Sequence, residues 1–197
     1  MKKVRLTTAI MVLAFVSLSA MSCKDAKKEN AHNHSSHSGT NHDNVGASNA
    51  MMNSNSQDSD AQKVLADYME LKDALVETDN DQASKAGKKL LNTLNEFDVS
   101  HYSAEQQKEL NDIIADAKEH AEHIGMSDID HQREHFKILS QDIMDMVAIT
   151  GTENTLYQQF CPMYDSGSAW LSMNEDIKNP YYGSKMLKCG KVQKEIN

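Results

Sequence analysis

Residues 103–125 read SAEQQKELNDIIADAKEHAEHIG, and their spacing decides the fold class of the chain. Ser103 stands three residues before Gln106, which is the pattern of a capping box at the start of a helix. Gly125 fits a helix C-terminus. Between these ends, apolar residues recur at intervals of three and four, the period of one helix face: Leu110, Ile113, Ile114, Ala117, Ala121 and Ile124. The stretch therefore predicts an amphipathic helix.

The same pattern extends to both sides of this helix. Residues 58–151 contain no proline, and their apolar residues keep helical spacing. We expect further helices over about 58–77, 80–97 and 128–150, with Asp79 or Asn80 and Ser127 or Asp128 as N-caps. Apolar stripes on four such helices, joined by short loops, can be hidden only against one another. The predicted fold is mainly α, a four-helix up-down antiparallel bundle over residues 58–151.

The third and fourth predicted helices carry four histidines, of which His131 and His135 are the candidate metal ligands. His131 and His135 are four residues apart and therefore share one helix face, so the pair can chelate one ion. The same pair can equally form a hydrogen-bonded polar margin of the bundle. On the preceding helix His120 lies close to the apolar stripe, and His123 points further outward. Two nearby carboxylates, Glu134 and Asp142, could orient a ligating imidazole or could simply be solvated.

The composition of the chain changes after Gly151, and residues 152–197 form a second predicted region. Helical periodicity stops, and Pro162 and Pro180 appear among glycines. Six aromatic residues crowd into this region: Tyr157, Phe160, Tyr164, Trp170, Tyr181 and Tyr182. We expect a loop-rich, aromatic C-terminal module with short strands or turns, packed on the bundle.

This region carries the soft ligands Cys161, Met163, Met186 and Cys189. The first interpretation is a Cys161–Cys189 disulfide, which would contribute on the order of 3 kcal/mol of stability. The second is a site for a soft metal ion, because thiolate and thioether ligands favour Cu(I) or Ag(I) over hard cations. Zinc fits less well, since thioether is a poor zinc ligand and the chain has no CxxC pair. The residues alone favour the disulfide slightly.

The N-terminus predicts export and lipidation. Basic residues at positions 2, 3 and 5 precede an apolar stretch over 8–21, which is typical of a secretory signal peptide over residues 1–22. Small residues then lead to Cys23, and this arrangement resembles a bacterial lipobox. The resemblance implies cleavage before Cys23 and lipidation of its thiol, hence a lipid-anchored protein of the periplasm or outer membrane.

Residues 23–57 are predicted to be a disordered, histidine-rich tether. The segment has almost no large aliphatic residue and is rich in Asn, Ser and His. Clustered imidazoles on a flexible strand suit weak binding of divalent transition metals. The alternative is a polar spacer whose histidines have no function. The candidate secondary ligands are His32, His34, His37 and His42.

The net charge of the chain and the motifs that it lacks argue against several classes of function. The formal net charge is −9, and removal of the basic signal makes the remaining chain more acidic. An acidic body argues against binding to nucleic acid and suits attraction of cations. We find no nucleophile motif, phosphate loop or distinct carboxylate pair, so the sequence predicts that the protein is not an enzyme.

Several segments together resemble a bacterial family of uncharacterised domains. They are the stretches beginning at Phe160 (FCPM), Trp170 (WLS), Ile177 (IKNPYYG) and Met186 (MLKCG), joined by DIDHQREHF from Asp128. This family occurs in small secreted proteins of Bacteroidetes-type bacteria and at the C-terminus of periplasmic adaptors of Cus-type copper/silver efflux pumps. The resemblance covers about residues 61–192, and its terminal motif is the specific part.

The resemblance implies a link to copper or a related ion. With the resemblance, a metal site formed by Cys161, Met163, Met186 and Cys189 becomes as well supported as the disulfide. The resemblance also supports His131 and His135 as metal ligands. We therefore expect a lipoprotein that binds copper, with Cu(I) favoured and zinc or silver as alternatives. The ion would be buffered or delivered to a heavy-metal efflux adaptor. The alternative is a structural or interaction module of the envelope, stapled by the Cys161–Cys189 disulfide. The most specific form of the metal hypothesis is a single site formed by these four sulfur residues and two histidines.

Overall fold

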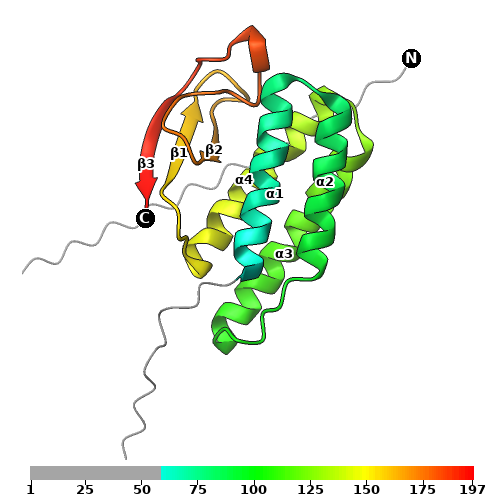
Figure 1. Cartoon of the computed structure of the whole chain (residues 1–197), viewed down its shortest axis with the longest axis vertical. Helices are drawn as coiled ribbons and strands as arrows, with labels where there is room; N and C mark the ends of the chain where they lie inside the picture. Colours follow the sequence, from blue (N-terminus) through cyan, green and yellow to red (C-terminus); the bar gives the residue numbers. More distant parts are fainter. Residues whose placement is uncertain (1–58) are drawn as a thin grey trace, which may run out of the picture. The chain divides into compact units, whose positions relative to one another are not determined.

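The computed structural model describes residues 59–197, which form four helices followed by a small sheet (Figure 1). The helices are α1 (Ser59–Glu77), α2 (Asn80–Asn95), α3 (Ala104–Met126) and α4 (Ile129–Thr150). The strands are β1 (Leu156–Cys161), β2 (Ser168–Ser172) and β3 (Lys191–Ile196). A 3₁₀ turn, Gly183–Lys185, lies before β3. The mainly helical character is confirmed, and the expected short strands form one sheet.

Local sequence signals explain where the helices begin. Asp79 caps α2 by accepting from the Gln82 backbone N–H, and Asp128 caps α4 by accepting from the His131 N–H. The predicted capping box of Ser103 and Gln106 is present at the start of α3. These caps satisfy backbone donors that have no partner inside the helix.

The predicted role of Gly125 as a helix stop is wrong. Helix α3 continues to Met126 and is followed by Ser127 at its C-cap. Instead, Gly125 and Gly87 allow α3 and α2 to approach closely. A Cβ on Gly87 would lie 2.8 Å from Cγ2 of Ile124, and a Cβ on Gly125 would lie 2.9 Å from Cγ of Lys88. Both glycines therefore serve the contact between the two helices.

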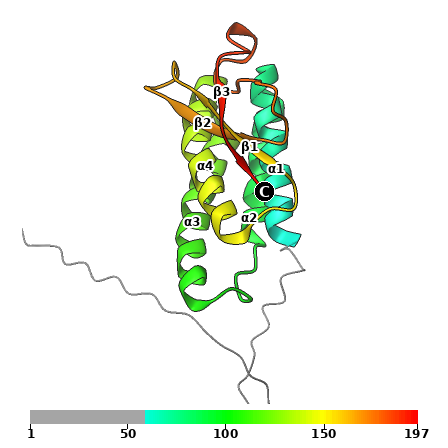
Figure 2. The same ribbon diagram turned by 90° about the vertical axis from the view of Figure 1, so that its left-hand side faces the viewer.

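The sheet is antiparallel in the order β2-β1-β3, and it packs on the helices as part of the same core. In Figures 1 and 2 the strands lie on the side of α1 and α4, and β2 contacts α4. Trp170, Leu171 and Tyr181 are buried in one cluster with the helix residues Tyr68 and Phe136. Two of the six aromatic residues of the C-terminal region, Trp170 and Tyr181, are thus core, and the partly buried Tyr164 and Tyr182 pack against it. None of the described helices is long and apolar enough to cross a membrane.

A candidate metal site between α3 and α4

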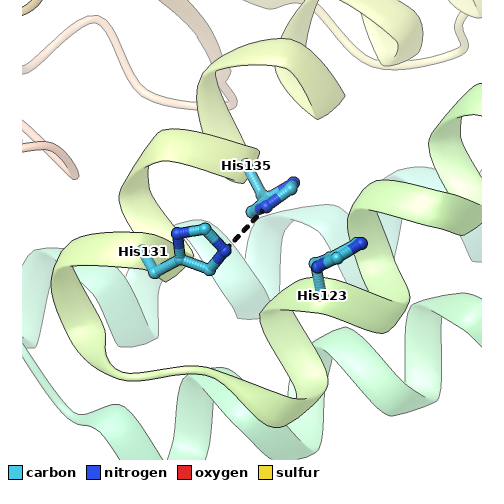
Figure 3. A group of neighbouring side chains, drawn as sticks. All are labelled: His123, His131 and His135. Carbon is cyan, nitrogen blue, oxygen red and sulfur yellow. Dashed lines mark hydrogen bonds between the residues drawn. The ribbon is translucent and has the colours of Figure 1, made fainter.

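Three histidines from two helices meet at the end of the helical part (Figure 3). His123 comes from the last turn of α3, and His131 and His135 come from the first two turns of α4. One ring nitrogen of each lies within 4.8 Å of one ring nitrogen of both others. The connection between the helices is only two residues long, so α4 starts beside the end of α3 and the spacing of four puts His131 and His135 on the face toward His123.

The ring of His131 is held with one nitrogen free for a ligand. Its Nδ1 lies 3.0 Å from Oε2 of Glu134, so Nδ1–H donates to the carboxylate. Its Nε2 then faces Nε2 of His135 at 3.0 Å. A carboxylate that accepts from the outer nitrogen of an imidazole is the usual way in which a metal-binding histidine is oriented. The contact between Glu134 and His131 is thus the one that an orienting carboxylate would make.

The ring of His135 has a comparable partner on α3. Its Nδ1 lies 2.9 Å from Nδ1 of His120. If Nε2 of His135 holds a metal ion, Nδ1 carries the proton and donates it to the lone pair of His120. Burial lowers the pKa of His135, and the charges of His123, His131 and His120 lower it further. Burial also lowers the pKa of His120. A lowered pKa favours the neutral form of both rings, which is the state that a metal ligand needs.

The spacing of the nitrogens suits a transition-metal ion. Imidazole nitrogens bind zinc at about 2.0–2.1 Å, which places two ligands of a tetrahedral site about 3.3 Å apart. The two Nε2 atoms at 3.0 Å are already close to that separation. The third ring, His123, lies parallel to His135 with centroids 4.4 Å apart. Three protein ligands would leave a fourth position of a tetrahedral ion open, and His131 is exposed to solvent.

Asp142, the second carboxylate considered from the sequence, lies elsewhere. Burial, together with the neighbouring charges of Asp116 and Asp145, raises its pKa to about 7. Its Oδ2 is buried and has no hydrogen-bond partner within residues 59–197. It is a partly buried acid and does not orient a histidine of the site.

The two cysteines meet in a second place. Cys161 ends β1, Cys189 lies two residues before β3, and their Sγ atoms are 3.0 Å apart. Both are free thiols, Cys161 fully buried and Cys189 half-buried. Met163 and Met186 lie nearby in the sequence, but their side chains are 61% and 37% exposed.

Four of the six predicted ligands thus form two separate pairs, one of histidines and one of cysteines, and the two methionines are exposed. The three-histidine cluster is the only group of three or more His, Cys, Asp or Glu side chains with metal-binding spacing in the described part of the chain. It contains neither cysteine, so the structure does not bring all six residues into one site. The cluster adds His123 as a candidate ligand, and His120 lies beside His135. The sequence places His120 and His123 three residues apart on α3, which could have marked them as candidates. It did not show that this part of α3 packs against His131 and His135 of α4.

The signal peptide, Cys23 and the histidines at positions 32, 34, 37 and 42 lie outside the described residues.

Comparison with known proteins identifies one similarity. A family model described as "Protein of unknown function (DUF3347)" matches residues 64–155. The matched segment begins within α1, covers α2 to α4 and all three histidines of the cluster, and ends before Cys161. The terminal motif, expected to be the specific part of the resemblance, lies beyond it. Neither the search of curated proteins nor the search of solved structures found a match.

Proposed function

We propose that this protein binds a copper ion, or a similar transition-metal ion, through His123, His131 and His135. One observation carries the proposal: the Nε2 atoms of His131 and His135 face each other at 3.0 Å, and each Nδ1 is occupied by an outer partner, Glu134 or His120. Both rings are therefore turned to present Nε2 to a shared ion. Imidazole ligands suit Cu(II), Zn(II) and Ni(II), so this site differs from the thiolate site for Cu(I) or Ag(I) expected from the sulfur residues.

The proposed role is metal homeostasis in the bacterial envelope, without a chemical reaction. Cleavage before Cys23 and lipidation of its thiol would anchor the protein to a membrane of the periplasm or outer membrane. Four helices in an up-down antiparallel order would hold the site at one end of a rigid body. The open fourth position and the exposure of His131 suit an ion that is exchanged with a partner, such as a heavy-metal efflux adaptor. The protein would buffer the ion or hand it on.

The test is a calorimetric titration of the mature protein with Cu(II) and with Zn(II). The four histidines of the N-terminal segment are first changed to alanine, so that weak binding there does not contribute: His32, His34, His37 and His42. We expect one ion per chain, and His123→Ala should weaken binding at least about 100-fold, because loss of a direct ligand exceeds the 10–100-fold loss typical of outer partners. His101→Ala, which removes a histidine outside the cluster, is the matched control.

Unchanged affinity in both His123→Ala and His131→Ala would reject the histidine site. Tight binding of Cu(I) that survives both substitutions but is lost in Cys161→Ser would instead move the metal function to the cysteines. Absence of any tight binding would favour the alternative role, a structural or interaction module of the envelope. The short distance between the Cys161 and Cys189 sulfurs is the observation that supports that alternative.

A further inference from the structure

The cysteine pair joins β1 to the segment before β3 through two sulfur atoms in contact. Sγ of Cys161 and Sγ of Cys189 lie 3.0 Å apart, and either thiol can be the hydrogen-bond donor. Cys161 is the last residue of β1, and Cys189 lies two residues before β3. Strand pairing between β1 and β3 therefore brings together two thiols that are 28 positions apart in the sequence.

These contacts make the two thiols unequal. Burial alone would raise the pKa of Cys161, but hydrogen bonds from Cys189, Met163, Tyr164 and Asn179 outweigh it, so the pKa lies below its ordinary value. The hydrogen bond to Cys161 and then burial raise the pKa of Cys189. Cys161 is the preferred thiolate but is fully buried, whereas Cys189 is half-buried and can be reached from outside. Ready attack needs a thiolate, and entry of a reagent needs access.

We propose that Cys161 and Cys189 form a reversible disulfide by thiol–disulfide exchange, in which Cys189 meets the external disulfide and Cys161 closes the bond. The Cys189 thiolate attacks R–S–S–R, forms a mixed disulfide and releases R–S⁻. The Cys161 thiolate then attacks Sγ of Cys189 and releases the second R–S⁻. Two protein thiols are oxidised, one external disulfide is reduced, and the two thiol protons end on two molecules of R–SH. This proposal does not rest on metal binding at the histidines.

The bond would fasten the C-terminal region at a point where it meets the core. It closes a ring over residues 162–188, which contains the buried Trp170, Asn179 and Tyr181. Asn179 already ties the ring together, since its Nδ2 donates to the carbonyl of Cys189 and its Oδ1 accepts from the Tyr181 N–H. Closure requires the sulfurs to approach by only about 1 Å, to the usual S–S length of about 2.05 Å. Oxidation should therefore occur without rearrangement of the sheet.

The test uses the full chain with Cys23→Ser, so that the two remaining cysteines are the pair. We expect oxidised glutathione to remove both free thiols and to leave no bound glutathione, as measured by mass spectrometry and thiol titration. The oxidised protein should melt roughly 6–12 °C above the reduced protein. Reduction with excess dithiothreitol should restore two thiols.

The single substitutions test the order of attack. Cys161→Ser should accumulate one stable glutathione adduct on Cys189, because the closing thiolate is missing. Cys189→Ser should react at least about tenfold more slowly, because Cys161 is buried. The proposal is overturned if the intact pair keeps a glutathione adduct, if Cys161 reacts first, or if the pair stays reduced. Binding of one Cu(I) by a reduced pair that resists closure would identify a soft-metal site instead.

Discussion

Glu134 shows how one residue can control the proposed metal site without touching the ion. Its carboxylate accepts from Nδ1 of His131 and thereby leaves Nε2 toward His135. Glu134→Gln should weaken metal binding by about 10–100-fold, because the neutral amide holds the ring less firmly and lowers the basicity of Nε2. Calorimetry of the variant measures this loss. Glu109→Gln is the control, because it removes one negative charge from α3, away from the histidine cluster. An equal loss of metal affinity in that control would assign the effect of Glu134→Gln to net charge.

Asp142 predicts a pH-dependent effect on stability. Its pKa is raised from 3.8 to about 7, mainly by burial, so the folded state keeps a proton that the unfolded state loses between these values. Its contribution to stability therefore falls as the pH rises from about 4 to about 7. Asp142→Asn should raise the free energy of unfolding by about 1–2 kcal/mol at pH 8, after allowance for partial exposure.

Urea denaturation at pH 8 and at pH 5 measures this effect of Asp142→Asn. The gain should be smaller at pH 5, because the acid in the folded protein is then largely protonated. The histidines with lowered pKa are present in both the native protein and Asp142→Asn. Their pH-dependent contributions to the free energy of unfolding therefore cancel when the two proteins are compared. Asp112→Asn, on the exposed side of α3, should show no such dependence. An equal gain for Asp142→Asn at both pH values would contradict the raised pKa.

At the scale of elements, Arg133 fastens α4 to two other parts of the chain. Its Nε donates to the carbonyl of Pro180 at 3.0 Å, and its Nη2 donates to the carbonyl of Leu75 at 3.2 Å and to Oγ1 of Thr78 at 3.0 Å. Gly183 completes the junction, because a Cβ there would lie 2.2 Å from Oγ1 of Thr78. The end of α1, the start of α4 and the loop before β3 therefore meet at one guanidinium.

Replacement of Arg133 should loosen this junction. Arg133→Met should lower the free energy of unfolding by about 2–4 kcal/mol, because buried carbonyls lose their donors. Arg133→Lys should recover only part of this loss, since one ammonium cannot reproduce the planar fork. Chemical denaturation followed by circular dichroism measures both. Equal stability of the lysine variant and the native protein would mean that charge alone suffices.

At the scale of the whole molecule, the helices and the sheet depend on one core. The Leu171 N–H donates to the hydroxyl of Tyr68, which lies 2.8 Å from Oγ of Ser140. Strand β2, α1 and α4 thus meet at a buried polar contact inside the apolar cluster that also holds Trp170 and Tyr181. A chain shortened after residue 155 would expose this surface of α1 and α4 to water.

We therefore expect the shortened chain to lose cooperative unfolding, even though it contains the whole segment matched by the family model. Its thermal melt by circular dichroism should be broad, and it should bind hydrophobic dyes. In the intact chain, Trp170 fluorescence and helical signal should report one transition at the same temperature. A sharp melt of the shortened chain at the native temperature would show that the helices are stable without the sheet.

The sequence by itself determined the helices and their starting points, because caps and apolar periodicity act between residues a few positions apart. Ser103, Asp79 and Asp128 cap helices as expected. It also identified His131, His135, Cys161 and Cys189 as the residues of interest. Only the tertiary structure decided how they combine. The distance between His123 and His135 depends on how α3 packs on α4, and the meeting of Cys161 with Cys189 depends on strand pairing across 27 intervening residues. These long-range contacts placed the expected histidines in a cluster with His123, paired the two cysteines elsewhere and left Met163 and Met186 exposed.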